Sequence, residues 1–74
     1  MDKIPQAEGL TFTNRERQVA ELIVGGKRTK EIAKIFDISP RTVEFFRTSL
    51  MRKTCTKNTA QLVMALAQLG FSER

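Results

Sequence analysis

The side chains best suited to contact another molecule are Lys and Arg residues gathered in the middle of the chain. The sequence has 13 Lys and Arg residues against eight Asp and Glu residues, a net charge of +5. Residues 27–57 hold nine of the basic residues and only three of the acidic ones, whereas the two flanking segments are close to neutral. Clustered positive charge attracts polyanions, while scattered charge mainly keeps a protein soluble. The distribution favours a docking face for a polyanion, although an ordinary solvated basic face would give the same count.

Side-chain catalysis and metal binding find little support in the same residues. The chain has no His and a single cysteine, Cys55, so a structural zinc site, an internal disulfide and His-dependent catalysis are excluded. Ser, Lys and carboxylate side chains remain, without a base arranged beside a nucleophile. We therefore expect no enzyme activity, metal, cofactor or small-molecule ligand. Cys55 is interpreted as a small structural thiol in preference to a redox sensor.

Helix start and stop signals divide the chain into four helices. Thr13 and Glu16 form a capping box before the first, and Gly25-Gly26 ends it. Thr29 is the expected cap of the second, Ser39-Pro40 starts the third, and Asn58 with Gln61 forms a second capping box for the last. The third helix is expected to run from residue 40 to about 53, and the fourth from 58 to 70.

No segment alternates in the way of a strand, and 74 residues can bury only one small core. We predict one all-α, four-helix domain over residues 10–71, a flexible N-terminal arm over 1–9 and a tail over 72–74. No apolar run is long enough to span a bilayer, so no membrane association is expected.

The second and third helices fit a helix-turn-helix over residues 29–53. Such a unit needs a small residue in its first helix, a turn residue able to take positive φ, and an apolar residue that locks the two helices together. Ala33, Asp37 and Val43 occupy these places. Because the basic cluster lies on the same unit, the pattern indicates a DNA reader. The outward side of the third helix carries, at helical spacing, Arg41, Glu44, Phe45, Thr48 and Arg52.

Several short motifs follow one another along the chain: LTFTNRERQV at 10–19, GKRTKEIA at 26–33 and ISPRTV at 38–43, then Lys53, Asn58, Leu62-Val63 and Gly70. In this order and at these intervals they resemble the LuxR/NarL-type DNA-binding domain. Each motif alone is weak, but together they are specific and cover nearly the whole chain. The resemblance implies a four-helix domain whose third helix enters the major groove and whose fourth helix pairs two subunits. The pattern is typical of the single-domain, GerE-like members, or of a fragment of a longer regulator.

Carried over residue by residue, the resemblance assigns roles to individual side chains. Bases would be read by Glu44, Phe45 and Thr48, because a Glu can accept from the cytosine amino group and a Phe can contact the thymine methyl. Phosphates would be bound by basic and hydroxyl side chains, several of them near helix starts where free N–H groups favour an anion. These are Lys27, Thr29, Lys30, Arg41, Thr42, Arg47 and Lys53. Two subunits would pair through Met64, Ala67 and Phe71, unless the monomer's own core absorbs that face.

Some positions depart from the family pattern. Phe46 stands where the family often has His, and Thr54-Cys55 stands where Leu-Gly is usual, so the end of the third helix is expected to differ. Ile35 is apolar at a commonly polar position. We interpret it as an ordinary surface residue, with contact to a partner such as RNA polymerase as the alternative.

Two functional hypotheses follow. The favoured one is a bacterial, cytoplasmic, sequence-specific DNA-binding transcriptional regulator, which binds double-stranded DNA as a dimer on paired half-sites roughly 34 Å apart. The alternative is a helical protein-interaction module of the same fold that has lost sequence-specific DNA binding.

Overall fold

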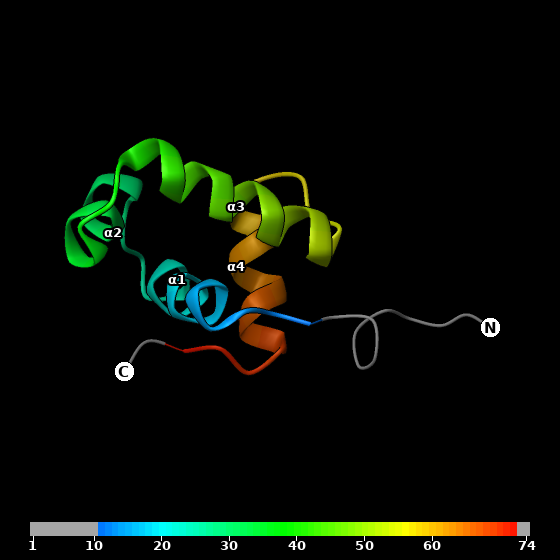
Figure 1. Ribbon diagram of the computed structural model, residues 1–74. Helices are drawn as coiled ribbons and strands as arrows, with labels where there is room; N and C mark the ends of the chain where they lie inside the picture. Colours follow the sequence, from blue (N-terminus) through cyan, green and yellow to red (C-terminus); the bar gives the residue numbers. More distant parts are fainter. Residues whose placement is uncertain (1–10, 73–74) are drawn as a thin grey trace.

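The computed structural model describes residues 11–72, and four helices make up most of that part of the chain. Helix α1 spans Asn14–Val24, α2 Thr29–Phe36, α3 Pro40–Thr54 and α4 Thr59–Gln68. In Figure 1, α3 crosses over α1 and α4, and α2 lies beside the N-terminal end of α3. Residues 11–72 contain no strand, which confirms the predicted all-α class. The predicted arm over 1–9 lies outside the described residues, as do residues 73 and 74 of the predicted tail.

One hydrophobic core joins all four helices. The buried apolar side chains recur at helical spacing and are Val19, Ala20, Ile23, Ile32, Ala33, Val43, Leu50, Leu62 and Leu66. Phe36, Phe46 and Val63 are half-buried against this core. The fourth helix was predicted over 58–70 but spans Thr59–Gln68, and Leu69, which follows it, is 38% exposed. Full burial of a Leu or Ile side chain contributes about 1.5–3 kcal/mol, so this core holds the helices together.

Side-chain caps start α1 and α3 as the sequence predicted. The Thr13 hydroxyl accepts the Glu16 N–H at 3.1 Å, and Glu16 Oε1 accepts the Thr13 N–H at 2.9 Å, which completes the capping box. At α3, the Ser39 hydroxyl accepts the Thr42 N–H at 3.1 Å, and Pro40 follows as the first helical residue. Each cap satisfies N–H groups that have no acceptor within their own helix.

The starts of α2 and α4 differ in detail from prediction. Arg28, not Thr29, is the residue before α2, and its N–H donates to Glu31 Oε1 at 2.7 Å. Thr29 is the first residue of the helix, and its hydroxyl does not cap α2 but bonds to a side chain of α3. At α4 the Asn58 side chain caps as predicted, but the Gln61 side chain accepts the N–H of Lys57 at 2.8 Å in place of that of Asn58.

All four helices are followed by a residue with left-handed backbone, which returns the chain toward the core. These residues are Gly26 (φ 92°), Asp37 (φ 57°), Cys55 (φ 58°) and Gly70 (φ 101°). The positive φ predicted for Asp37 is thereby confirmed, and short polar side chains tolerate this conformation. Cys55 adopts it without being a Gly, so α3 still ends in a left-handed turn, although the sequence predicted a different end for this helix. The helix runs to Thr54, one residue beyond the predicted end at Lys53.

Replacing Cys55 by Gly is expected to raise the free energy of unfolding by about 0.5 kcal/mol. The left-handed conformation costs a residue with a Cβ about 1–2 kcal/mol, and the greater freedom of Gly in the unfolded chain offsets part of that gain. The Cys55 side chain is exposed, so no core packing is lost. Urea unfolding of the Gly variant, with Cys55→Ala as a control that keeps the Cβ, measures the difference. A Gly variant less stable than the Ala variant would contradict the expectation.

Candidate nucleic-acid interface

The outward side of α3 is open to solvent. Arg41, Glu44, Phe45 and Thr48, here called the outer α3 surface, are all exposed and line one hollow together with Thr42. Phe45 is 72% exposed, more than the exposed Ile35, Met64 and Leu69. The three side chains predicted to read bases therefore lie together, on the side of α3 opposite the core.

Basic side chains lie near the N-terminal ends of α2 and α3. Lys27, Lys30 and Arg41 are exposed there, as predicted for phosphate contacts, and Arg28 lies among them. The N-terminus of a helix carries a partial positive charge, so these ends and their side chains favour an anion at the same places. The Thr42 hydroxyl, another predicted contact, shares a hydrogen bond with the Ser39 hydroxyl at 3.0 Å.

Glu44 and Thr29 contact each other across the helix-turn-helix. The Thr29 hydroxyl donates to Glu44 Oε2 at 2.7 Å, and Arg47 Nε lies 3.5 Å from Glu44 Oε1. The Glu44 side chain is nevertheless 58% exposed. Sequence reasoning placed Thr29 toward a phosphate and Glu44 toward a base as separate contacts, whereas the structure joins them.

Arg47 lies against the body of the domain. Its Nη2 donates to the Thr59 hydroxyl at 2.5 Å, at the start of α4, and its side chain is only 17% exposed. The guanidinium of Arg47, which was predicted to contact a phosphate, links α3 to α4 and to Glu44. Arg47 also lines a second hollow with Lys27, Arg28, Thr29 and Thr59, between the starts of α2 and α4.

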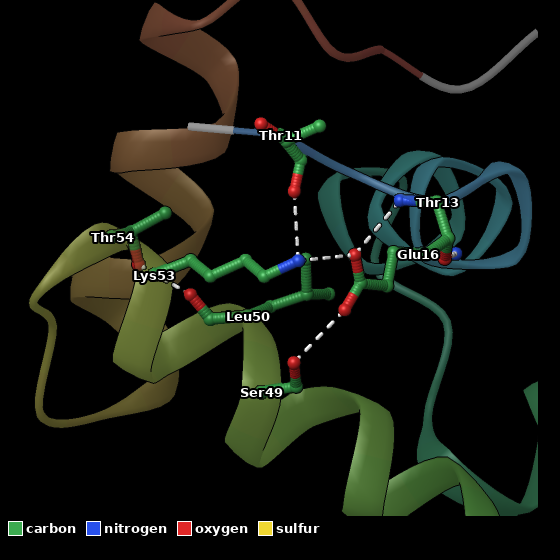
Figure 2. Close-up of polar contacts among 7 residues, drawn as sticks. All are labelled: Thr11, Thr13, Glu16, Ser49, Leu50, Lys53 and Thr54. Carbon is green, nitrogen blue, oxygen red and sulfur yellow. Dashed lines mark hydrogen bonds and ion pairs between the residues drawn. The ribbon is translucent and has the colours of Figure 1, made fainter. Parts of the chain in front are cut away.

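Lys53 lies in a second cluster of long-range polar contacts, separate from the one around Arg47 (Figure 2). Its ammonium donates to Glu16 Oε1 at 2.7 Å and to the Thr11 carbonyl at 2.8 Å, while the Ser49 hydroxyl donates to Glu16 Oε2 at 2.9 Å. The Lys53 nitrogen also lies 5.5 Å from the centre of the Phe12 ring. Lys53, which was predicted to contact a phosphate, joins α3 to the start of α1. The predicted capping role of Glu16 is confirmed, and Glu16 has this second role beside it.

The environment of Glu16 favours its charged form. Burial raises the pKa of this carboxyl, but the hydrogen bonds from Lys53, the Thr13 N–H and Ser49, with the charge of Lys53, outweigh burial and leave the pKa below its ordinary value of 4.5. The carboxylate, whose side chain is 8% exposed, is therefore ionised at neutral pH and holds α1 and α3 together.

The predicted subunit-pairing residues on and after α4 differ in exposure. Met64 is 65% exposed and Ala67 is exposed beside it. Phe71 is half-buried, with its ring edge-on to that of Phe12 at 5.4 Å between centroids. The core thus absorbs part of the face, through Phe71, and Met64 and Ala67 remain on the surface. Ile35 on α2 is 54% exposed.

Sequence reasoning did not find three residues of this region. They are Arg28, Ser49, which donates to Glu16, and Thr59, which accepts from Arg47. Ser49 and Lys53 are four residues apart, a spacing that places two side chains on one helix face and would have signalled a shared partner. Arg28 lies between Lys27 and Lys30 in the sequence, so its place among the basic residues before α2 could also have been predicted. The approach of Thr59 to Arg47 depends on how α4 packs, and no local pattern predicts it.

The described residues show no metal centre. Residues 11–72 bring together no group of three or more His, Cys, Asp or Glu side chains that could hold an ion. None of their helices is both long enough and apolar enough to pass through a bilayer.

Comparison with known proteins identifies relatives of this domain. The model of the GerE family, described as bacterial regulatory proteins of the luxR family, matches residues 10–66. The spore germination protein GerE of Bacillus subtilis is 43% identical over 62 residues, which cover 84% of each chain. The transcriptional regulatory protein FixJ of Rhizobium meliloti is 50% identical over 58 residues, 77% of this chain and 28% of FixJ. The chain therefore spans less than a third of FixJ.

Solved structures share the fold. A crystal structure of the Vibrio cholerae VqmA-ligand-DNA complex matches with a TM-score of 0.82 and 28% identity, over 100% of this chain and 32% of that chain. A VqmA dimer without target DNA matches with a TM-score of 0.81 and 31% identity, over 89% of this chain and 30% of that one.

Proposed function

Because this chain belongs to the luxR family of bacterial regulatory proteins, we propose that it binds double-stranded DNA at specific sequences and so regulates transcription. The observation that supports this most directly is the outer α3 surface, an exposed helix face that carries Phe45 and Thr48 and is flanked by basic helix starts. The major groove of B-DNA admits an α-helix, and base edges there distinguish all four base pairs. VqmA, which shares the fold, has been crystallised with DNA.

The side chains divide into two sets in this proposal. Glu44, Phe45 and Thr48 face the base edges, with Phe45 against a thymine methyl. The phosphate backbone is bound by exposed side chains at the helix starts: Lys27, Arg28, Lys30, Arg41 and Thr42. Lys53 and Arg47 are left out of this set because their side chains are partly buried, Lys53 against Glu16 and the Thr11 carbonyl and Arg47 against Thr59.

The regulator acts by binding alone and not as an enzyme, in the bacterial cytoplasm where the DNA lies.

Titration of labelled genomic fragments at several salt concentrations tests DNA binding. We expect a preferred sequence and an affinity that falls steeply with salt, because each phosphate contact releases counterions. Uniform or undetectable binding would refute the proposal and favour the alternative of a protein-interaction module.

We further propose that two copies pair through the exposed part of α4, as the VqmA dimer indicates that a protein of this fold can assemble in pairs. Met64 and Ala67 are three residues apart and so share a helix face. The paired α3 helices would then contact half-sites about one helical turn apart.

Replacing Met64 by Glu is expected to abolish this pairing, because two like charges would meet at the centre of a symmetric contact. Met64 is 65% exposed, so the monomer should keep its stability. Sedimentation of the free and DNA-bound protein measures the oligomeric state. Gln18→Glu, an exposed position on α1, is a control of equal charge away from α4. Unchanged pairing in the Met64 variant would assign the dimer contact to another surface.

A further inference from the structure

We propose that Thr29 is a positioning residue for base recognition: its hydroxyl holds the Glu44 carboxylate in the orientation that accepts from the amino group of a cytosine. This inference rests on the proposed function, and it replaces the phosphate role that the sequence assigned to Thr29. The residues that carry it come from three helices, with Thr29 in α2, Glu44 and Arg47 in α3, and Thr59 in α4.

The Glu44 carboxylate accepts one hydrogen bond and makes one ion pair within the domain. The Thr29 hydroxyl donates to Oε2 at 2.7 Å, and Arg47 Nε lies 3.5 Å from Oε1. Hydrogen bonds to a charged acceptor are about twice as strong as those between neutral groups. Thr29 is half-buried in α2, so the donor has a fixed position. Arg47 is fixed in turn by Thr59. The carboxylate is therefore held before any base arrives.

The same contacts leave Glu44 able to recognise a base. An ionised carboxylate has about four acceptor positions. Thr29 donates to one of them, and the ion pair with Arg47 adds no hydrogen bond. The Glu44 side chain remains 58% exposed and lines the hollow of the outer α3 surface. Arg47 also offsets the negative charge of Glu44, which lowers the repulsion between this carboxylate and nearby phosphates.

The chemistry of a carboxylate selects the base. Because Glu44 can only accept, it needs a donor at the base edge. Guanine presents two acceptors in the major groove and thymine an acceptor with a methyl, so both are disfavoured. Adenine has an amino donor but also the N7 acceptor beside it, whereas cytosine presents only its N4 amino group. Cytosine is thus the base that Glu44 should prefer.

The two roles of Thr29 exclude each other. A Thr hydroxyl has one proton to donate, and a phosphate oxygen and a carboxylate oxygen are both acceptors. A hydroxyl that donates to Glu44 cannot at the same time donate to a phosphate. The positioning role predicts a change in preference at one base pair, whereas a phosphate role predicts weaker binding to every sequence.

Selection from a randomised duplex library, followed by titration of the selected sites, tests the inference with the full chain. For the unmodified protein we expect a cytosine at one position, preferred about tenfold over other bases. Thr29→Val should lose most of that preference and should change binding to sites without this cytosine less than twofold. Thr29→Ser keeps the hydroxyl and should therefore keep the cytosine preference. If Thr29→Val weakens all sites alike and keeps the cytosine preference, the inference is overturned and the proposed function stands. If the unmodified protein selects no sequence, the proposed function itself has failed.

A second measurement needs no variant of Thr29. The selected cytosine is replaced by 2-pyrimidinone, which lacks the amino group, and the duplex is titrated with the unmodified protein and with Glu44→Ala. We expect the replacement to weaken binding of the unmodified protein about tenfold and to leave the Glu44→Ala variant unaffected. An equal loss for both proteins would show that Glu44 does not contact the amino group.

Discussion

Replacing Glu16 by Ala is expected to lower the free energy of unfolding by about 3 kcal/mol, because it removes a buried carboxylate that accepts three hydrogen bonds, each worth about 1 kcal/mol or more. The Glu16 side chain is 8% exposed and accepts from the Thr13 N–H, the Ser49 hydroxyl and the Lys53 ammonium. The substitution removes the Glu16 half of the α1 capping box and the link to α3 together. Small domains are stable by about 0.05–0.15 kcal/mol per residue, so this loss is a large part of the total. Urea unfolding measures it.

A double-mutant cycle separates the ion pair from the cap. Glu16→Gln keeps the size of the side chain and an acceptor for the Thr13 N–H, and Lys53→Met keeps the aliphatic part of Lys53. If the pair links α1 to α3, the double variant should be more stable than the sum of the two single losses predicts, by 1 kcal/mol or more. Strict additivity of the two losses would show that the carboxylate and the ammonium do not stabilise each other.

The same pair gives the stability a dependence on pH. The pKa of Glu16 in the folded state lies below the ordinary value of 4.5, so the unfolded state takes up a proton first as the pH falls. The contribution of Glu16 is complete above the unfolded pKa and is lost progressively as the pH falls through the folded pKa. The difference in stability between the native protein and Glu16→Gln should therefore shrink below about pH 4.5.

The sequence predicted the local structure of this domain well because local rules determine it. Thr13 with Glu16 and Ser39 with Pro40 mark helix starts through contacts within one helical turn. Asp37 was predicted to take positive φ from the needs of the turn, and it does. The core positions follow from helical spacing, which decides which side chains share a face.

Long-range polar contacts escaped prediction, for a physical reason. Lys53 and Arg47 are basic residues on a helix expected to contact DNA, and the resemblance to the family assigned them to phosphates. Their acceptors lie far away in sequence: Glu16 precedes Lys53 by 37 residues, and Thr59 follows Arg47 by 12. Which charge meets which acceptor depends on how the helices cross, and helical spacing does not contain that information. The contact between Thr29 and Glu44 escaped prediction for the same reason.

Replacing Thr48 by Glu is expected to weaken binding to a specific DNA site about 100-fold. Thr48 is exposed on the outer α3 surface with Phe45, and a carboxylate there would lie in the major groove between two rows of phosphates. Like charges placed opposite each other at an interface cost several kcal/mol, and each 1.4 kcal/mol changes the affinity tenfold. The fold should persist, because the new Glu faces away from the core and has Arg52 one turn later on α3. Titration of a selected duplex measures the affinity.

Gln18→Glu is the matched control for this substitution. It changes the net charge of the protein by the same amount from an exposed position on α1, the helix that packs against the inner side of α3. Long-range repulsion from the added charge should weaken binding of the two variants alike and should fade at high salt, since ions screen exposed charges beyond about 10 Å. Only Thr48→Glu should keep its deficit at high salt. If both variants lose the same affinity and recover it together, the contribution of α3 would be general electrostatic attraction and Thr48 would not lie at the bases.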